Sequence, residues 1–294
     1  MAETTRITSL DVLLDPTGKM LLSEAYDGVL ENVQKTTISS KLKNTDLSGD
    51  PTAGTVEAKR FVNATSKAYG TARGASAGDK VKGKPVTIPI DTDREFVEEI
   101  EQKDVSLLGV DGLIAKRSAN HALRMAAELD SKFFEVAATE GTKFTPTKTD
   151  IQDIVEEAIV TLETLKNDYI DGVDRSLMSI TFDPATYSQM RSFLDTKVNN
   201  SNVDTSQEEF FTYHGVRCYS SVRLPISVAG KTTTTTKFIL QVDGSIAQPI
   251  RSTPYAAERI PMSEAMAVEL FFYYGTKAVT PETILVYNTE VTTS

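Results

Sequence analysis

The sequence has 294 residues, of which 40% are hydrophobic and 24% charged, as in folded proteins and unlike disordered ones. Its formal net charge of -10 argues against broad electrostatic attraction to nucleic acid. The charge leaves open a container whose wall encloses nucleic acid without binding it tightly. The single cysteine, Cys218, excludes an intramolecular disulfide, so packing and assembly must supply the stability.

Residues 1–49 are rich in Thr, Ser, Leu and Asp and predict an N-terminal arm. Apolar residues at helical spacing between Leu21 and Leu30 predict one amphipathic helix, which is too small to form a core and must pack on another part of the structure. Residues 1–14 lack the basic start and apolar core of a secretory signal. No apolar run approaches the roughly 18 residues of a membrane helix. We therefore expect synthesis in the cytoplasm and no membrane partner.

Two stretches with alternating apolar residues, Thr55–Tyr69 and Lys84–Thr92, predict the strands of a long hairpin. The segment between them, residues 70–83, is rich in Gly, Ala and Lys and predicts a mobile tip, because it is too small and polar to pack. Pro85 and Pro89 place the second strand at an edge, since proline has no amide hydrogen to donate to a neighbouring strand.

The charges of this region are segregated along the chain. Basic residues dominate the hairpin: Lys59, Arg60, Lys67, Arg73, Lys80, Lys82 and Lys84. Acidic residues dominate the hinge that follows it: Asp91, Asp93, Glu95, Glu98, Glu99, Glu101 and Asp104. A basic projecting loop and an acidic hinge favour head-to-tail contacts between copies of the chain, which close into rings when the rotation allows. A solvated hairpin that folds back on itself explains the same pattern equally well.

Residues 104–140 predict a single long helix. One face carries a continuous stripe at helical spacing, formed by Val110, Ile114, Ser118, Ala122, Met125, Leu129, Phe133 and Val136. From about Asp111 to Thr139 this helix would be roughly 40 Å long at 1.5 Å per residue, which favours the role of a strut. Gly141 suits a left-handed exit from the helix.

Beyond the long helix, the pattern predicts a mixture of helices and strands. Thr149–Leu165 has the most regular amphipathic spacing in the chain, with Thr149 and Gln152 as an expected capping box. Residues 176–182 predict a strand, and Asp183 and Pro184 predict the start of the next helix. The inner face of that helix is expected to carry Tyr187, Met190 and Leu194.

The last third of the chain is predicted to be rich in strands. A polar loop is expected at residues 199–209, and the threonine run after Lys231 is expected to be an exposed loop. Strands are expected near Gly215–Val222, Lys237–Val242, Ala265–Tyr274 and Thr283–Tyr287. The chain has no internal repeat of the length found in solenoid proteins.

Candidates for catalysis are few. His121 falls on the inner face of the long helix and His214 precedes a turn glycine, and neither has a cysteine or acid at the spacing of a nucleophile or metal site. We interpret His121 as a packed helix residue and Cys218 as a small core residue in a strand. The sequence therefore predicts no catalytic residue and no enzyme activity.

Two further clusters miss the patterns of ligand sites. Asp168, Asp171 and Asp174 surround Gly172, but their spacing is not that of a calcium loop, so they are expected to be loop acids. The glycines of the hairpin tip lack the Gly-Lys-Ser/Thr ending of a phosphate loop and are interpreted as flexible; they are Gly70, Gly74 and Gly78. We expect no cofactor and no metal.

The elements follow one another as a polar arm, a basic hairpin, an acidic hinge, a strut helix and, late in the chain, a long strand. This order resembles the major capsid proteins of tailed bacteriophages, which have the Hong Kong 97-type fold. Five stretches resemble landmarks of that family. Val86–Ile90, which leads to Glu98 and Glu99, resembles the return strand of the extended loop, and Ala119–Phe134, with Arg124, Ala127, Leu129 and Asp130, resembles the spine helix. Ser179–Pro184 and Phe211–Pro225 resemble parts of the axial domain, and Glu269–Val279 resembles the long strand and its exit. The resemblance covers nearly the whole chain.

The resemblance implies an α+β fold with four parts. They are an N-terminal arm at residues 1–50, an extended β-hairpin loop at 51–104, a peripheral domain with the spine helix at 105–148 plus 250–275, and an axial domain at 149–249 plus 276–294. It further implies a homo-oligomer, whose pentamers and hexamers form an icosahedral virion shell around double-stranded DNA. The shell protein would not read the DNA sequence. Assembly would take place in the host cytoplasm with a scaffolding protein and a portal. Because the arm is short, any scaffold is expected to be a separate protein, or the chain is already trimmed.

Some relatives join a loop lysine to an asparagine of a neighbour. Lys80, Lys82 and Lys84 lie near the tip, but no matching asparagine or acid is found, so a non-covalent shell is expected.

Other functions stay open at this point. An encapsulin-like compartment shares the fold but holds a protein cargo, so its contents distinguish it from a capsid. A β-rich surface adhesin or tail component is a different class, against which the absent secretion signal and the strut after a basic hairpin both argue. A hydrolase is disfavoured by the scarcity of histidine and cysteine.

Overall fold

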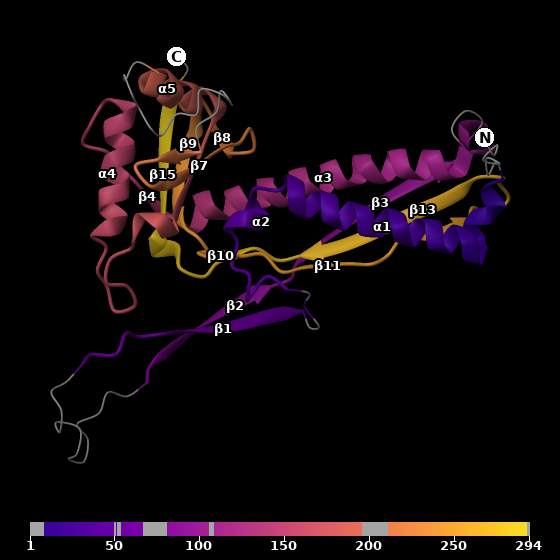
Figure 1. The fold of residues 1–294 in the computed structure, drawn as a ribbon, viewed down its shortest axis with the longest axis horizontal. Coiled ribbons are helices and arrows are strands. Elements are labelled where there is room, and N and C mark those ends of the chain that lie inside the picture. Colours follow the sequence, from indigo (N-terminus) through magenta and orange to yellow (C-terminus); the bar gives the residue numbers. More distant parts are fainter. Residues whose placement is uncertain are drawn as a thin grey trace, which may run out of the picture.

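The computed structural model describes residues 9–49, 51, 54–66, 81–105, 109–195 and 211–292. Helices and sheets are mixed along the chain, as predicted (Figure 1). A long helix with a sheet and a second helix beside it forms an elongated part, a taller α/β part stands at one end, and a two-stranded hairpin projects from the region between them (Figure 1).

The long helix is α3 (Gly109–Glu140), which has 32 residues and is therefore about 48 Å long at 1.5 Å per residue. All eight residues of the predicted stripe are buried, which confirms the helix and its inner face. The expected left-handed exit at Gly141 is wrong, because that residue does not have a positive φ. Glycine is needed there for space instead, since a Cβ atom at this position would lie 2.8 Å from Cγ2 of Ile284.

A sheet covers one side of α3. Strands β3 (Thr92–Ile100) and β13 (Met266–Tyr274) are antiparallel along their whole length, and β11 (Ile250–Ser252) and β12 (Ala256–Arg259) pair with the other edge of β13. The acidic hinge expected at residues 91–104 is thus mostly a strand, followed by the short 3-10 helix η3 (Gln102–Val105). Alternate residues of β3 face α3 while the intervening acids face outward, so its many charges concealed the strand period.

The N-terminal segment packs against its own chain. The 3-10 helix η1 (Leu10–Leu14) leads into α1 (Pro16–Thr36), which lies along α3 (Figure 1), and α2 (Ser39–Leu42) follows. The predicted helix at Leu21–Leu30 lies within α1. Its buried Leu22, Val29 and Val33 join the core of α3 and the sheet, as its small size required.

Two alternating stretches form the predicted hairpin. Strand β1 (Thr55–Phe61) pairs antiparallel with β2 (Gly83–Pro89), in a register that runs from Thr55 opposite Pro89 to Phe61 opposite Gly83. They form a two-stranded sheet, so Pro85 and Pro89 lie on an edge strand as expected. The expected tip at residues 70–83 lies for the most part outside the described residues.

The α/β part is built on a seven-stranded sheet. Its strand order is β4 (Thr142–Lys143), β15 (Ile284–Thr292), β9 (Thr232–Val242), β5 (Met178–Phe182), β7 (Val216–Ser220) and β6 (Thr212–Tyr213), with β8 (Ile226–Ala229) also paired to β9. Helices α4 (Ile151–Glu163) and α5 (Pro184–Asp195) pack on one face with a core that includes Ile180, Phe238 and Leu240. The end of α3 packs on the opposite face through Phe133 and Phe134. One sheet therefore joins the two parts of the molecule.

The remaining elements are short and lie near this junction. They are the pair β10 (Ile246–Ala247) and β14 (Lys277–Ala278), and the 3-10 helices η4 (Arg175–Leu177) and η5 (Pro281–Thr283). The expected strand at residues 176–182 is confirmed from Met178 onward, and the other four expected strands correspond to β7, β9, β13 and β15. Residues 199–209, expected to be a polar loop, lie outside the described residues.

Three local expectations have different outcomes. The threonine run after Lys231 is not a loop but the first half of β9, where β-branched residues suit a strand that has β8 and β15 on its two sides. The capping box of Thr149 and Gln152 is wrong, since α4 begins after Asp150 without a side-chain cap. The cap of α5 is confirmed, because Oδ1 of Asp183 accepts a hydrogen bond from the amide of Thr186 at 2.9 Å.

Two glycines of α1 predict opposite effects of alanine. Gly28→Ala should stabilise the protein by about 0.5–1 kcal/mol, because nothing lies within 4 Å of the added methyl group and glycine is the poorer helix former. Gly18→Ala is the matched control and should destabilise it, since its Cβ would lie 2.6 Å from the carbonyl carbon of Val12. Thermal unfolding of both variants measures the difference, and a loss of stability in Gly28→Ala would contradict the account.

Candidate assembly surfaces

The residues considered for catalysis all have structural contacts. His121 is buried in α3, Cys218 is buried in β7, and His214 takes the left-handed conformation at the β6–β7 turn before Gly215. Burial raises the pKa of the Cys218 thiol, which keeps it protonated and unreactive. The burial of His121 and Cys218 matches their interpretation as packed residues.

The loop acids are not gathered into a site. Asp171 pairs with Lys166 at 2.9 Å, and the carbonyl oxygen of Asp168 accepts a hydrogen bond from the amide of Asn63. Across the described residues, no three His, Cys, Asp or Glu side chains are close enough together to hold a metal ion. Gly70, Gly74, Gly78 and Lys80 lie outside the described residues.

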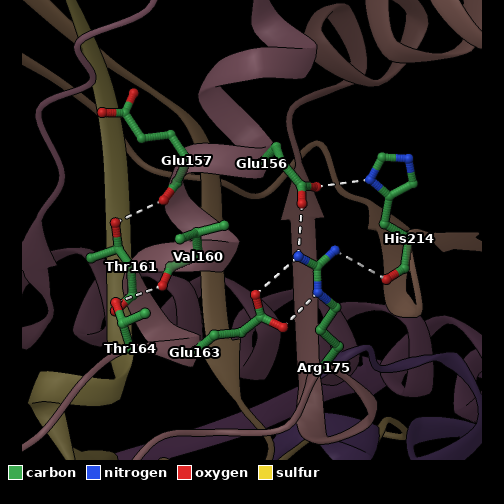
Figure 2. Close-up of polar contacts among 8 residues, drawn as sticks. All are labelled: Glu156, Glu157, Val160, Thr161, Glu163, Thr164, Arg175 and His214. Carbon is green, nitrogen blue, oxygen red and sulfur yellow. Dashed lines mark hydrogen bonds and ion pairs between the residues drawn. The ribbon is translucent and has the colours of Figure 1, made fainter.

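An arginine-centred cluster, which sequence reasoning missed, holds α4 to the turns beside it (Figure 2). Arg175 donates to both carboxylate oxygens of Glu163, at 2.6 and 2.9 Å, and to Glu156 at 2.7 Å. Nδ1 of His214 lies 2.8 Å from the other oxygen of Glu156. Burial raises the pKa of Glu156, but the hydrogen bonds from Arg175 and His214 outweigh it and lower that pKa. The carboxylate therefore stays charged, and the cluster links α4 to Arg175 and to the β6–β7 turn.

A buried carboxylate joins three parts of the chain near the middle of α3. The side chain of Asp130 is 0% exposed. Its Oδ1 accepts a hydrogen bond from the amide of Ser39 at 2.9 Å, and its Oδ2 accepts one from the amide of Ile38 at 3.2 Å. Arg223, in the connection between β7 and β8, lies 3.4 Å from Oδ2. The turn at α2 is thus fixed to α3 by backbone hydrogen bonds to a buried charge, a role that the sequence pattern did not indicate.

The outer end of the β1–β2 ladder, on the side of the tip, contacts the α/β part. Arg60 forms an ion pair with Glu282 and its guanidinium lies over the ring of Tyr169, 4.4 Å from the ring centre. Just beyond β1, the amide of Asn63 donates to the carbonyl oxygen of Asp168 at 2.9 Å. A cleft of about 910 Å³ lies between this end of the ladder and the end of α3 and is lined by Lys84 and Lys277 among others. The hairpin is therefore held to its own chain near the outer end of the ladder, where Phe61 and Val81 stay exposed.

The outer face of the β3–β13 sheet carries unpaired acids. Residues of β3 that face α3 are satisfied inside the chain, as Arg94 pairs with Glu128 and Glu98 with Arg117. The alternate residues Asp93, Glu95 and Glu99 are exposed, and none forms an ion pair with another described residue. A groove of about 730 Å³ runs beside them, and its lining residues are Asp93, Arg94, Glu95, Thr253, Phe271, Phe272 and Tyr273. We call the three exposed acids together with Thr253, Phe271 and Tyr273 the outer sheet face.

A second exposed surface lies at the far end of the seven-stranded sheet. Val228 and Val291 flank Thr233 in register across β8, β9 and β15, and Ile226 is opposite Thr235 two residues away. All three aliphatic side chains are exposed and no charged residue shares these register positions.

None of the helices in the described part of the chain combines the length and apolar character needed to span a bilayer.

Comparison with known proteins places the fold. No protein-family model matches the sequence, and no curated protein matches it. Solved structures do match: the capsid structure of the cyanophage P-SCSP1u has a TM-score of 0.63 and 12% identity, with 86% of this chain and 88% of that chain covered. A structure from Mycobacterium phage Che8 has a TM-score of 0.56 and 17% identity, with 80% and 84% covered. A virus-like particle from Pyrococcus furiosus has a TM-score of 0.52 and 13% identity, with 90% and 97% covered.

These structural neighbours span the elongated part and the α/β part together, since each covers at least 80% of the chain. At such low identities the likeness is one of fold and not of individual residues. The chain has the tailed-phage major capsid protein fold that the sequence resemblance predicted.

Proposed function

We propose that the protein is a structural shell protein, the major capsid protein of a tailed bacteriophage, whose copies assemble as pentamers and hexamers into an icosahedral virion shell around double-stranded DNA. The observation that carries this proposal is the likeness to phage capsid structures over most of the chain, joined to a hairpin that projects from the body. Its activity is assembly and not catalysis. A separate scaffolding protein and a portal are the expected partners, and the host cytoplasm is the expected place of assembly.

The division into parts follows from this function. We assign residues 1–50 to an N-terminal arm, 51–104 to the extended loop, 105–148 plus 250–275 to a peripheral domain and 149–249 plus 276–294 to an axial domain. Strand β3 is the exception, because its pairing with β13 joins it to the peripheral domain. In this assignment α3 is the spine helix that connects the peripheral and axial domains.

The hairpin of one copy is proposed to bind the outer sheet face of the next copy. The exposed lysines Lys59 and Lys82 flank the apolar Phe61 and Val81 on the hairpin. The outer sheet face offers the opposite charges and a groove against Phe271. Copies that each carry -10 repel one another at long range, so opposite charges brought together at a contact both steer and orient the association.

Charge reversal on the hairpin tests this contact. Lys59→Glu together with Lys82→Glu should lower the yield of shells at least tenfold, because like charges across an interface cost several kcal/mol. Adding Asp93→Lys and Glu95→Lys to the same chain should restore shells, since every copy then carries both reversed surfaces. Negative-stain electron microscopy and sedimentation velocity measure the yield.

The control for net charge is Lys19→Glu with Lys148→Glu, two exposed lysines on α1 and before α4 that change the charge by the same amount. This control should assemble normally. Shells from the hairpin variant at wild-type yield would refute the proposed contact while leaving the capsid function intact. A purified wild-type protein that stays monomeric with the hairpin folded on its own body would refute both.

A second candidate function shares the fold. The likeness to the virus-like particle from Pyrococcus furiosus, which covers 90% of this chain, leaves an encapsulin-like compartment of the same fold as the alternative. The two candidates differ in contents, so nuclease-protected DNA in purified particles supports the capsid and a co-purifying cargo protein without DNA supports the compartment.

A further inference from the structure

Helix α4 carries carboxylates that the arginine-centred cluster does not use. Asp150 and Asp153, at its N-terminal end, are exposed and form no ion pair with another described residue. The carboxylate of Glu157 points away from Arg175 (Figure 2) and accepts hydrogen bonds from the hydroxyl and the amide of Thr147, at 2.7 and 3.0 Å. These bonds lower the pKa of Glu157, so it stays charged. This side of α4 is therefore acidic.

A groove of about 570 Å³ runs along the same side of α4. Three acids line it, Asp153, Glu156 and Glu157, together with Lys148, Val160 and two threonines. Val160 is 43% exposed, so an apolar side chain lies among the carboxylates. We call Asp150, Asp153, Glu157 and Val160 the α4 face.

Basic residues gather where α2 meets the connection between β7 and β8, on the opposite side of the sheet. Leu42 of α2 and Leu224 of the connection belong to one apolar cluster. The ammonium group of Lys41 lies 5.8 Å from the ring centre of Tyr219 in β7. Lys41 and Arg223, the residues before Leu42 and Leu224, therefore belong to one surface.

This surface holds more positive charge than its own chain neutralises. Arg223 shares the buried Asp130 with two backbone amides. Lys41 and Lys43 form no ion pair with another described residue. Burial lowers the pKa of Lys43 and no carboxylate of the described residues raises it, so a carboxylate from another molecule would stabilise its charge. Val222, beside Arg223, is 82% exposed. We call Lys41, Lys43, Val222 and Arg223 the α2 face.

The two faces cannot meet within one copy of the chain. Helix α4 packs on the side of the seven-stranded sheet that carries Ile180 and Phe238, whereas α2 packs on the side of Ile239 and Val286 (Figure 1). Two α4 faces would place like charges together, and so would two α2 faces. Opposite charges come together only when the α4 face of one copy meets the α2 face of another. Such a contact is heterologous, which is the kind that closes rings.

We propose that the α4 face binds the α2 face of the neighbouring copy around each ring, with Val222 in the groove beside Val160 and the two lysines against the carboxylates. Lysine side chains suit this place, because their apolar stems cover apolar surface while their charged ends reach the acids. The inference rests on the proposed function, since it names a second contact between neighbours in the same ring. It uses no residue of the hairpin or of the outer sheet face.

Reversing the charge of one face at a time tests the contact. Lys41→Glu with Lys43→Glu should lower the yield of shells at least tenfold, and so should Asp153→Lys with Glu157→Lys, because each pair places like charges across the contact. A chain with all four changes should assemble, since both of its faces are then reversed. Negative-stain electron microscopy counts the shells, and circular dichroism checks that each variant is folded.

A mixture of the two reversed chains distinguishes a head-to-tail contact from other arrangements. The two chains should alternate around a ring, which closes a hexamer but not a pentamer, because an odd number of copies leaves two like chains adjacent. The mixture should therefore form hexamers and open assemblies without closed icosahedral shells. The control for net charge is Lys19→Glu with Lys116→Glu, two exposed lysines of α1 and α3, and it should assemble normally.

Chemical cross-linking locates the contact without changing a charge. A chain with Val160→Cys and Val222→Cys, treated with a short bismaleimide after assembly, should give a ladder of linked copies up to pentamers and hexamers on a denaturing gel. Either cysteine alone should give nothing larger than linked pairs. The matched control, Leu123→Cys with Val222→Cys, moves the first cysteine to an exposed position of α3 and should give no ladder. The native Cys218 is buried and stays unreactive.

The contact is overturned if either reversed variant gives shells at wild-type yield, if the mixture forms closed shells, or if shells of the chain with both Val160→Cys and Val222→Cys give no ladder. It is also overturned if Lys41→Glu with Lys43→Glu abolishes binding of a double-stranded oligonucleotide while shells form normally, since the α2 face then binds nucleic acid. Should that variant not fold, Asp153→Lys with Glu157→Lys and the cross-links decide the matter. In all these cases particles still form and the proposed function stands, whereas wild-type protein that forms no particles overturns both.

Discussion

Replacement of Asp130 by alanine is expected to cost about 3–5 kcal/mol of unfolding free energy, the range found when one partner of a buried charged contact is removed. The carboxylate is fully buried and accepts hydrogen bonds from two consecutive amides, those of Ile38 and Ser39. Without it these amides face no acceptor, and an unpaired buried donor alone costs about 1–3 kcal/mol. The turn at α2 also carries the fully buried Leu42, so its release opens the core between α3 and the seven-stranded sheet.

Urea unfolding followed by circular dichroism measures this loss. Asp130→Asn should be intermediate, because the amide retains one acceptor oxygen and turns a donor toward the other backbone N–H. The matched control is Glu135→Ala on the same helix, an exposed carboxylate whose ion pair with Lys132 lies at the surface and contributes at most about 1 kcal/mol. A loss below 1 kcal/mol in Asp130→Ala would show that α2 is held by its apolar contacts instead.

The periodicity of apolar residues in the sequence predicted those elements that bury only one of their faces. Helix α3 has one buried stripe and helix α4 another, so apolar residues recur every three or four positions and reveal both. Strand β3 was missed because its inner face includes Arg94 and Glu98, whose charges are neutralised by Glu128 and Arg117 from α3. A charge that is paired with a residue of another element looks, in sequence, like a charge in water.

The same reason explains which site residues escaped the sequence reading. Asp130 was noted only for its resemblance to a spine helix, because an acid among the many charges of α3 has no visible partner until α2 folds over it. Arg175 likewise gathers Glu156 and Glu163 from a helix that ends twelve residues earlier. Charge segregation between hairpin and hinge was visible in the sequence, but which acids face outward became clear only from the register of β3 on β13.

Gly275→Ala is expected to displace the hairpin and abolish shells while leaving the rest of the chain folded. Gly275 follows the last residue of β13, and a Cβ atom there would overlap the carbonyl oxygen of Pro89 and lie 2.9 Å from its carbon. These are backbone atoms at the end of β2, so no side-chain rotation relieves the clash. The neighbouring Ile88 is fully buried against Ala247 and Val279, so moving Pro89 also disturbs that small core. Overpacking of this kind costs about 1–3 kcal/mol.

The comparison that isolates the clash is Gly54→Ala at the same hairpin base. The carbonyl oxygen of Gly54 accepts a hydrogen bond from the amide of Ile90 at 3.0 Å, yet nothing lies within 4 Å of a Cβ atom built on it. Gly54→Ala should therefore assemble normally, whereas Gly275→Ala should remain in small species by sedimentation velocity with its helical circular dichroism retained. The angle of the hairpin matters to a shell because each copy must reach the next one, and a displacement repeated at every contact prevents closure. Normal particles from Gly275→Ala would mean that the hairpin finds its neighbour whatever the geometry of its base.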